Sequence, residues 1–476
     1  MERSAQQLVS RLKADFSGDL IGPSDPQYPR ARVLWNAMVD RMPGLIARCA
    51  HVGDVQSAVR AAVAGDILTA VRCGGHSLAG FSSCEDGLVI DLSLMRDVTV
   101  DEEARLAYVG GGCLLSTIDT ATQKAGFVYP AGVVSHTGAA GLILGGGTGW
   151  LTRMFGMSCD NVQQFTLVTS NGSVEHASAR ENSDLYWALR GGGGNFGIVT
   201  EFVLRLHPLK SVMLGNCRWF GDDILQVLRD WRDFMPDAPD ELKWNLSLRI
   251  LAPDNGAQNA GAVPTLSSSA VWLGEKSKGH RHLARIFSIG RSCAIQEEMI
   301  PYLRLQTMAD AEFPVGRRYY TKSGYFKTLS DDSLCKMIEA LPSVPCPNSQ
   351  IELAYLGGCA ARVSPAETAF GSRAAPYIMN ILADWDSPGD DAKNISWVRS
   401  LFANLRPAMQ PGVYVNFMSG DESERIKEAY SERWDRLVAV KTHYDPSNFF
   451  RLNQNIPPLQ RESLGSRSSI DAGSGT

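Results

Sequence analysis

Three glycine-rich segments interrupt the first 200 residues of the chain: "RCGGHSLAG" (72–80), "TGAAGLILGGGTG" (137–149) and "RGGGGNFG" (190–197). Glycine is favoured where the backbone takes φ > 0 or must approach another group closely. Backbone N–H groups of such loops can also converge on a pyrophosphate without a helix dipole. The fold is therefore expected to bring three loops of unusual backbone geometry into one domain, with a phosphate-bearing ligand between them.

The context of these glycines excludes two common nucleotide-binding motifs. Gly192, Gly194 and Gly197 satisfy G-x-G-x-x-G, but a helical segment precedes them and a strand-like segment follows. The dinucleotide fingerprint requires the opposite order and an acidic residue about 20 positions later, and the stretch 212–220 has none. A P-loop needs Gly-Lys-Ser/Thr, which is missing from "CGGHSL" and "GGGTGW". The loops therefore predict phosphate binding of another type.

The hydrophobic pattern predicts an α+β unit up to about residue 210. Asn171-Gly172 between two alternating runs is typical of a type I′ hairpin turn. The other expected elements are helices at 53–66, 114–126 and early in 181–209, and strands at 67–71, 87–95, 98–112 and late in 181–209. Farther along, helices are expected at 394–406 and 421–441 with a strand at 412–418, and the tail 461–476 is expected to be disordered.

Composition argues against several classes of partner. A net charge of -5 and a pI near 6.0 provide no basic footprint for nucleic acid. The N-terminus "MERSAQQLVSRLKADF" lacks the apolar run of a secretory signal, and no run of about 18 apolar residues predicts a membrane span, so a cytoplasmic protein is expected. The ten cysteines are scattered, without C-x-x-C pairs or histidines at metal-ligand spacing, so no metal site is expected.

Four longer runs, in order and at the expected spacing, resemble the berberine bridge enzyme-like flavoproteins of the vanillyl-alcohol oxidase superfamily: "VRCGGHSLAGFSSCEDGLVIDLSLM", "GGGTGWLTRMFGMSCDNV", "LRGGGGNFGIVTEFVLRLHP" and "VKTHYDPSNFFRLNQNIPP". The likeness spans about residues 30–460. It implies an α+β fold with a PCMH-type FAD-binding domain of two α+β subdomains (1–210). A substrate domain with an antiparallel sheet backed by helices (211–411) and a C-terminal segment returning to the FAD domain (412–460) would follow.

The resemblance also implies how FAD is held. The family's R-G-G-H motif falls on Arg72, Gly74, Gly75 and His76, with Cys73 between, so His76 would be bonded to the flavin 8α carbon while Arg72 to Ser77 wrap the pyrophosphate. Many relatives have a second tether on a cysteine, and Val134 stands at that position, which predicts one covalent link. Further FAD contacts are expected from Ser135, Gly138, Gly141, Gly146, Gly149, Val199, Asn416 and Asn448.

The implied reaction passes a hydride from a small organic substrate to FAD while a nearby base removes a proton. Phe417 and Ile378 occupy the two positions where family members carry that base, and neither side chain can accept a proton. The remaining candidates are Tyr414, Tyr319, Tyr320, Asn380 and Asp384, and Lys322 could hold an anionic substrate.

Two enzymatic functions follow from this resemblance, beside a third, non-catalytic alternative as a flavin-binding or scaffold protein. The first is an FAD-dependent oxidase of specialised metabolism with O2 as the electron acceptor. The alternative, motivated by the missing bases, is a redox-neutral cyclase or pericyclase-like enzyme on the same scaffold.

Overall fold

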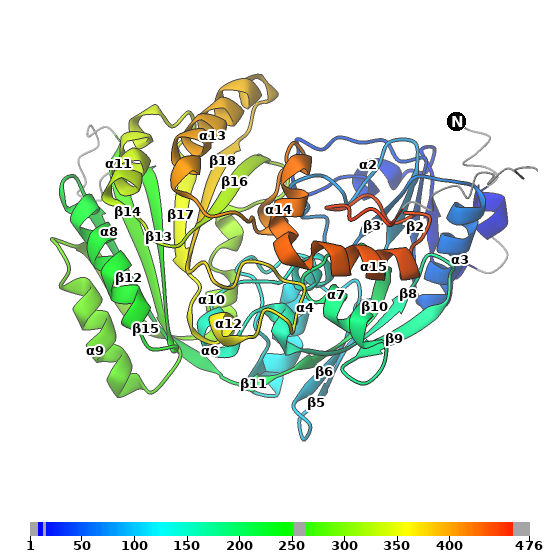
Figure 1. Cartoon of the computed structure of the whole chain (residues 1–476), viewed down its shortest axis with the longest axis horizontal. Helices are drawn as coiled ribbons and strands as arrows, with labels where there is room; N and C mark the ends of the chain where they lie inside the picture. Colours follow the sequence, from blue (N-terminus) through cyan, green and yellow to red (C-terminus); the bar gives the residue numbers. More distant parts are fainter. Residues whose placement is uncertain (1–7, 13–15, 252–261, 460–476) are drawn as a thin grey trace, which may run out of the picture.

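The computed structural model describes residues 8–12, 16–251 and 262–459. Figure 1 shows two halves: one is built on a long seven-stranded sheet, and the other contains the N-terminal strands and a five-stranded sheet. The last helices of the chain return to the N-terminal half. The fold is the α+β arrangement that the sequence predicts.

The chain begins with a four-stranded sheet and two helices: β1 (Asp19–Ile21), α2 (Tyr28–Ala31), β2 (Leu45–Arg48), α3 (Val52–Ala64), β3 (Thr69–Arg72) and β4 (Leu88–Asp91). β2, β4 and β3 are parallel, and β1 is antiparallel to β2. The strands are almost continuously buried, which is typical of parallel strands with both faces covered. The first glycine-rich segment follows β3 directly, so this sheet fixes where that loop begins.

A five-stranded antiparallel sheet of order β5-β6-β10-β8-β9 comes next. The elements of this region are β5 (Val98–Asp101), β6 (Leu106–Gly110), α4 (Leu115–Lys124), β7 (Phe127–Val128), α5 (Ala139–Leu144), α6 (Thr152–Phe155), β8 (Val162–Val168), β9 (Val174–Ser178), α7 (Ser183–Leu189), β10 (Ile198–Arg205) and β11 (His207–Pro208). Helix α7 precedes the third glycine-rich segment and strand β10 follows it, which is the order that excludes a Rossmann fingerprint.

The hairpin between β8 and β9 is present, but the prediction of a type I′ turn is wrong. Gly172 has φ +77°, whereas Asn171 is not among the residues with positive φ, and type I′ requires both. Asn171 Oδ1 instead accepts a hydrogen bond from Ser173 N (2.8 Å), a local side-chain turn that asparagine favours.

The second half is a seven-stranded antiparallel sheet of order β15-β12-β14-β13-β17-β18-β16. Its elements are β12 (Ser211–Phe220), α8 (Asp223–Phe234), β13 (Leu242–Leu251), β14 (Val263–Trp272), α9 (Lys276–Phe287), β15 (Cys293–Pro301), α10 (Tyr302–Thr307), β16 (Arg318–Phe326), α11 (Asp331–Glu339), β17 (Gln350–Tyr355), α12 (Gly358–Arg362), β18 (Tyr377–Trp385) and α13 (Asp391–Leu405).

Alternate residues of each strand in this sheet point to opposite faces. One face packs against α8, α9, α11 and α13 through an apolar core that includes Trp219, Trp244 and Trp385 (Figure 1). Residues of the opposite face are largely polar, and they form the wall of a cavity rather than a second apolar core. None of the helices in the described ranges is long and apolar enough to cross a membrane.

The C-terminal segment differs from the prediction at two places. Residues 412–418 form a turn with a 3₁₀ helix at Val415–Phe417, and Asn416 Nδ2 donates to Leu142 O (3.1 Å), so side-chain contacts replace the expected strand pairing. The helix expected over 421–441 is divided into α14 (Ile426–Tyr430) and α15 (Trp434–Tyr444), because Ser431 between them has φ +47°. The tail 461–476 lies outside the described residues.

Candidate functional site

All three glycine-rich segments line one cavity of about 410 Å³, called the glycine cavity below. The backbone of these segments and four residues of the C-terminal segment contribute to its wall: Gly74, Gly75, Gly138, Gly141, Gly193, Gly194, Gly197, Phe450, Leu452, Asn453 and Gln454. A Cβ on Gly141 or Gly194 would meet no atom within 4 Å, so a side chain there would fill open space. The Oδ1 atom of Asn453 is buried without a partner among the described residues. The cavity is therefore a backbone cradle with an unused polar atom.

Not every glycine in this wall is required for the same reason. A Cβ on Gly74 would lie 2.3 Å from the backbone N of Gly138, and a Cβ on Gly138 would lie 2.3 Å from the N of Gly74. Gly75 has φ +72°, a conformation that side chains disfavour. Contact between two loops thus explains Gly74 and Gly138, whereas space in the cavity explains Gly141 and Gly194.

His76 lines the glycine cavity between an indole and a second imidazole. Its ring stacks on Trp35 with centroids 4.8 Å apart, and its Nε2 lies 2.8 Å from Nδ1 of His136. Burial, and then the neighbouring His136, lower the pKa of His76 to about 3, so this imidazole is neutral near pH 7. Because His136 engages Nε2, Nδ1 is the nitrogen available to a ligand.

A second cavity, of about 570 Å³, lies against the polar face of the seven-stranded sheet and is called the sheet cavity. Five strands supply hydrogen-bonding side chains to it: Asn216, Lys243, Asn245, Ser247, Ser267, Ser269, Glu352 and Asn380. Six residues line both cavities: Val133, Thr148, Phe313, Glu352, Asn380 and Phe417. A group in the glycine cavity and a small molecule in the sheet cavity would meet at this junction.

Glu352 and Asn380 face the junction from neighbouring strands. They are opposite each other in the β17–β18 register, and Asn380 Nδ2 donates to Glu352 Oε2 (2.9 Å) while Asn380 Oδ1 accepts from Thr321 Oγ1. Burial raises the pKa of Glu352, and the hydrogen bond from Asn380 opposes that shift. Glu352 is a carboxyl group positioned to exchange a proton at the junction.

Tyr414 lines the glycine cavity, but its hydroxyl oxygen is already engaged. It accepts hydrogen bonds from Gly147 N (3.0 Å) and from Asn416 Nδ2 (3.0 Å), and burial raises its pKa to about 12. A general base works best with a pKa near the operating pH. Tyr414 is therefore better suited to positioning Asn416 and the glycine turn than to removing a proton.

Comparisons with known proteins establish the family. A protein-family sequence model described as FAD binding domain matches residues 43–178. A second family model, described as berberine and berberine like, matches residues 413–457. A Bacillus subtilis (strain 168) protein named Uncharacterized FAD-linked oxidoreductase YgaK is 31% identical, covering 94% of this chain and 99% of that protein. The chain belongs to the berberine bridge enzyme-like family of FAD-linked oxidoreductases.

Relatives of known activity and structure extend this comparison. The (R)-6-hydroxynicotine oxidase of Paenarthrobacter nicotinovorans is 29% identical over 95% of this chain and 99% of that protein. The solved structure of Physcomitrella patens BBE-like 1 has a TM-score of 0.85 at 26% identity, covering 95% of this chain and all of that one (100%). The protein is thus an FAD-dependent oxidoreductase with the PCMH-type α+β fold, and the glycine cavity fits FAD through its backbone cradle and the unpartnered Asn453.

Most of the residues expected at the FAD site line the glycine cavity: Cys73, Gly74, Gly75, His76, Ser77, Gly138, Gly141, Val199 and Asn416. Arg72 and Ser135 do not. The guanidinium of Arg72 is buried against Asp91 (Nη2–Oδ2 2.6 Å), where it ties the ends of β3 and β4 together. Asp310 accepts from both the N (2.7 Å) and the Oγ (2.6 Å) of Ser135. Both residues shape the loops rather than face the cavity.

Gly146, Gly149 and Asn448 also lie outside the wall of the glycine cavity. A Cβ on Gly146 would lie 2.7 Å from the Phe370 ring, and Gly149 lines the sheet cavity instead. Asn448 has φ +55° in the turn after α15, just before the residues that do line the cavity. Asn448 thus has a left-handed backbone conformation in a tight turn, which asparagine tolerates better than most residues.

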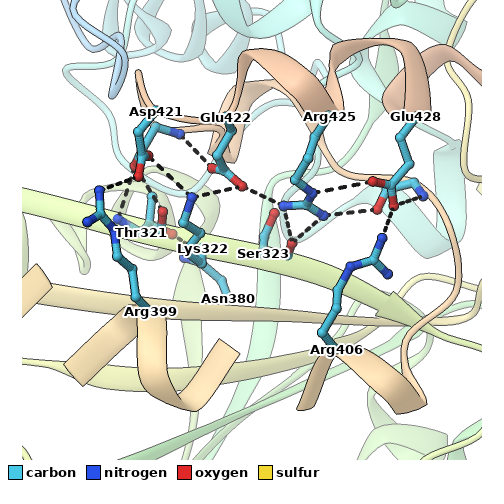
Figure 2. A network of polar contacts seen from close by, with 12 residues as sticks. Thr321, Lys322, Ser323, Asn380, Arg399, Arg406, Asp421, Glu422, Arg425 and Glu428 are labelled. Atoms are coloured by element: carbon cyan, nitrogen blue, oxygen red, sulfur yellow. Dashed lines mark hydrogen bonds and ion pairs between the residues drawn. The ribbon is translucent and has the colours of Figure 1, made fainter. Parts of the chain in front are cut away.

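Asp384 and Lys322, expected near the substrate, line neither cavity. Asp384 is buried in an ion pair with Arg317. Lys322 Nζ lies 3.2 Å from Asp421 Oδ1 and 3.4 Å from Glu422 Oε1. Figure 2 shows that this lysine belongs to a polar network joining β16 and α13 to the segment around α14. Both side chains are therefore committed to structural ion pairs.

Sequence reasoning missed Glu352, His136 and Lys243. Glu352 lies in "QIELAY", where polar and apolar residues alternate, but alternation ordinarily indicates a solvent-facing strand surface. A count of polar residues on all strands of this sheet could have shown that one whole face is polar. Within the described ranges, no group of three or more His, Cys, Asp or Glu side chains could hold a metal ion.

Proposed function

We propose that this protein is an oxidase of a small organic molecule, with FAD tethered through His76 and O2 as the electron acceptor. Bound FAD supplies a hydride acceptor for a carbon of the substrate. The observation that carries the proposal is the junction of the two cavities at Glu352, Asn380 and Phe417. We assign residues 1–210 and 412–460 to FAD binding and 211–411 to substrate binding.

The junction residues have separate roles in this proposal. Glu352 accepts the proton that leaves a substrate N–H or O–H group, and its raised pKa brings it closer to the working pH of an efficient base. Asn380 donates to one carboxylate oxygen and so fixes the orientation of Glu352. Phe417 supplies an apolar wall where some relatives carry a tyrosine.

A single covalent link is proposed because one wall residue is a suitable nucleophile. His76 is neutral and has Nδ1 available, which supports bond formation to the flavin. Val134 lines the same cavity at the position of the second tether, and its side chain has no nucleophilic atom. One relative is, by its name, an oxidase of (R)-6-hydroxynicotine, which supports a small-molecule substrate.

Acid precipitation and intact mass measurement of the native protein test the cofactor and its tether. The expected results are a yellow pellet and a mass increase of one FAD. His76→Ala should release the colour into the supernatant, whereas His443→Ala, a change at an exposed histidine, should retain it in the pellet. A native protein without a flavin spectrum contradicts the function, and a yellow pellet from His76→Ala contradicts the attachment site.

A redox-neutral cyclisation is the competing function. The argument for it is that Phe417 and Ile378 have no titratable group where relatives carry a base. Glu352 weakens this argument, because it supplies a carboxyl group at the junction of the two cavities. Anaerobic mixing with a turnover substrate distinguishes the two, because oxidation of the substrate bleaches the flavin band at about 450 nm. Product formation without bleaching would support the cyclase.

A further inference from the structure

Lys243 is a buried basic side chain in the wall of the sheet cavity. Its side chain on β13 lines the sheet cavity, the residue is 2% exposed, and its Nζ makes one hydrogen bond, to Tyr355 O (3.3 Å). No carboxylate within the described ranges forms an ion pair with it. An ammonium group can donate three hydrogen bonds, and an unpaired buried charge is costly. Two N–H donors of the Lys243 ammonium are thus unused at a buried site, where an unpaired charge destabilises the fold.

The surroundings of Lys243 add positive charge rather than neutralise it. Arg153 of α6 is 1% exposed and donates to three backbone carbonyls, Leu242 O and Ala238 O (2.8 Å each) and Pro239 O (3.3 Å). Its Nη1 has no partner in the described structure. Asp240, whose charge acts on Arg153, forms its ion pair with the exposed Arg362 instead. Tyr355 contacts both cations: Arg153 Cζ lies 5.2 Å from the centroid of its ring, and its backbone oxygen accepts from Lys243. An anion in this part of the cavity would therefore meet Lys243 in the wall, while Arg153 lies outside the lining and acts on the site through its charge.

Two more polar atoms in the wall of the same cavity lack partners. Asn245 Oδ1 and Trp150 Nε1 are buried and make no hydrogen bond to the described residues. Asn245 is two residues beyond Lys243 on the same face of β13, and Ser247, two residues farther on, is opposite Glu352 in the register with β17. Four residues of strand span about 13 Å, which sets the distance from Lys243 to the junction on the order of 10 Å.

We propose that the substrate carries a carboxylate, which the Lys243 ammonium binds in the sheet cavity while the reacting carbon lies at the junction beside Glu352. The inference rests on the proposed function. It selects acids with about 10 Å between the carboxylate and the oxidised carbon, which is a span that a small aromatic or alkyl acid can provide.

Binding of the carboxylate should depend on pH, because Lys243 must be protonated to attract it. Burial and then Arg153 lower the pKa of Lys243 to about 7, so without a bound anion this side chain is partly neutral at physiological pH. A bound carboxylate favours the ammonium form, so binding should take up a proton at pH 8 and should weaken as the pH rises through 7. The other titratable or charged side chains that line the cavity are Cys217, Arg218, Arg249, Glu312 and Glu352. Arg249 and Glu312 form an ion pair, and the contribution of Glu352 is removed by repeating the comparison in Glu352→Gln.

Calorimetric titration of the holoenzyme with 4-phenylbutanoate and its primary amide tests the proposal, because the two probes differ chiefly in charge. At pH 6 the acid should bind at least about tenfold tighter than the amide, as a charged hydrogen bond warrants. Lys243→Met should abolish that preference, whereas Lys278→Met, at an exposed position on α9, should keep it. Proton uptake is measured at pH 8 in two buffers of different ionisation enthalpy.

Several results would overturn the proposal. They are equal binding of the two probes, no binding of the acid to flavin-loaded protein, and an unchanged preference in Lys243→Met. Thermal unfolding of Lys243→Met keeps the test independent of folding failure, because loss of an unpaired buried charge should leave Tm unchanged or raise it. Absence of the flavin spectrum would instead contradict the proposed function.

Discussion

Burial, more than charge pairing, sets the protonation of the side chains around the two cavities. It is the largest cause of the lowered pKa of His76 and Lys243 and of the raised pKa of Glu352 and Tyr414. Each shift favours the neutral form of the side chain. The protonation of these four side chains therefore follows from their depth in the molecule, and substitutions that keep their shape separate the effect of charge from that of packing.

Glu352→Gln keeps the shape of the side chain and removes its capacity as a base. With a turnover substrate, we expect anaerobic flavin reduction to slow by about 10²–10⁴-fold, the range typical of general base catalysis. In the native enzyme the rate should rise with pH through the raised pKa of Glu352, because the base acts when ionised. Stopped-flow absorbance measures both effects, with the exposed Glu367→Gln as the control. An unchanged pH profile in Glu352→Gln would assign the base elsewhere.

Asp119 provides a pH dependence of stability that needs no substrate. This carboxyl group on α4 is 1% exposed; Gln306 Nε2 donates to its Oδ2 (3.0 Å), and burial raises its pKa from 3.8 to about 7. The folded state thus binds the proton more tightly than the unfolded chain. The resulting stabilisation is complete below the unfolded pKa near 3.8 and is lost as the pH rises through about 7.

Asp119→Asn should therefore flatten the pH profile of thermal stability. The native Tm should fall between about pH 5 and pH 8, and at pH 8 the variant should be more stable than the native protein by up to about 4 kcal/mol, since one pKa unit corresponds to about 1.4 kcal/mol. Calorimetry at several pH values provides the measurement. Asp222→Asn, at an exposed carboxylate, should keep the native profile, and an equal slope in both variants would disprove the assignment.

At the scale of elements, α5 contains a glycine that helix formation does not require. Gly141→Ala adds a Cβ that meets no protein atom within 4 Å and points into the glycine cavity, and alanine is a better helix former by about 1 kcal/mol. We expect the apoprotein to unfold at the same or a higher temperature, while the flavin-to-protein ratio measured by absorbance falls. Gly22→Ala, which also meets open space but lines neither cavity, should retain full flavin.

The elements also divide into those that local sequence predicts and those that it does not. α3, α4 and the strands of the N-terminal half follow from apolar periodicity, because each packs one face or a whole run against its neighbours. The turn at Val415–Phe417 does not, because its conformation depends on Leu142, 274 positions earlier in the chain. Glu352 was missed for a similar reason. Its strand face lines a cavity only because residues of the N-terminal half form the opposite wall.

For the whole molecule, a buried lysine is among the residues that hold the C-terminal segment against the N-terminal half. Lys441 of α15 is 0% exposed, and its Nζ lies 2.6 Å from Asp445 Oδ2 and donates to Asn195 O (2.8 Å) and to Phe450 O (3.0 Å). Asp445 in turn accepts from the backbone N of Phe450 (2.8 Å). These contacts connect the third glycine-rich segment to the residues that line the far wall of the glycine cavity.

Lys441→Met should test how the C-terminal segment is attached without changing the residues at the junction of the two cavities. The variant leaves Asp445 buried and without its cation, so we expect a loss of about 3–5 kcal/mol in the free energy of unfolding, measured with urea, together with a lower flavin-to-protein ratio. Adding Asp445→Asn should recover part of that energy, because it removes the uncompensated charge while keeping an oxygen for the backbone N–H groups. Lys427→Met, at an exposed position on α14, should change neither quantity. If the double variant is no more stable than Lys441→Met, the carbonyl contacts of the lysine, rather than its ion pair, hold the C-terminal segment in place.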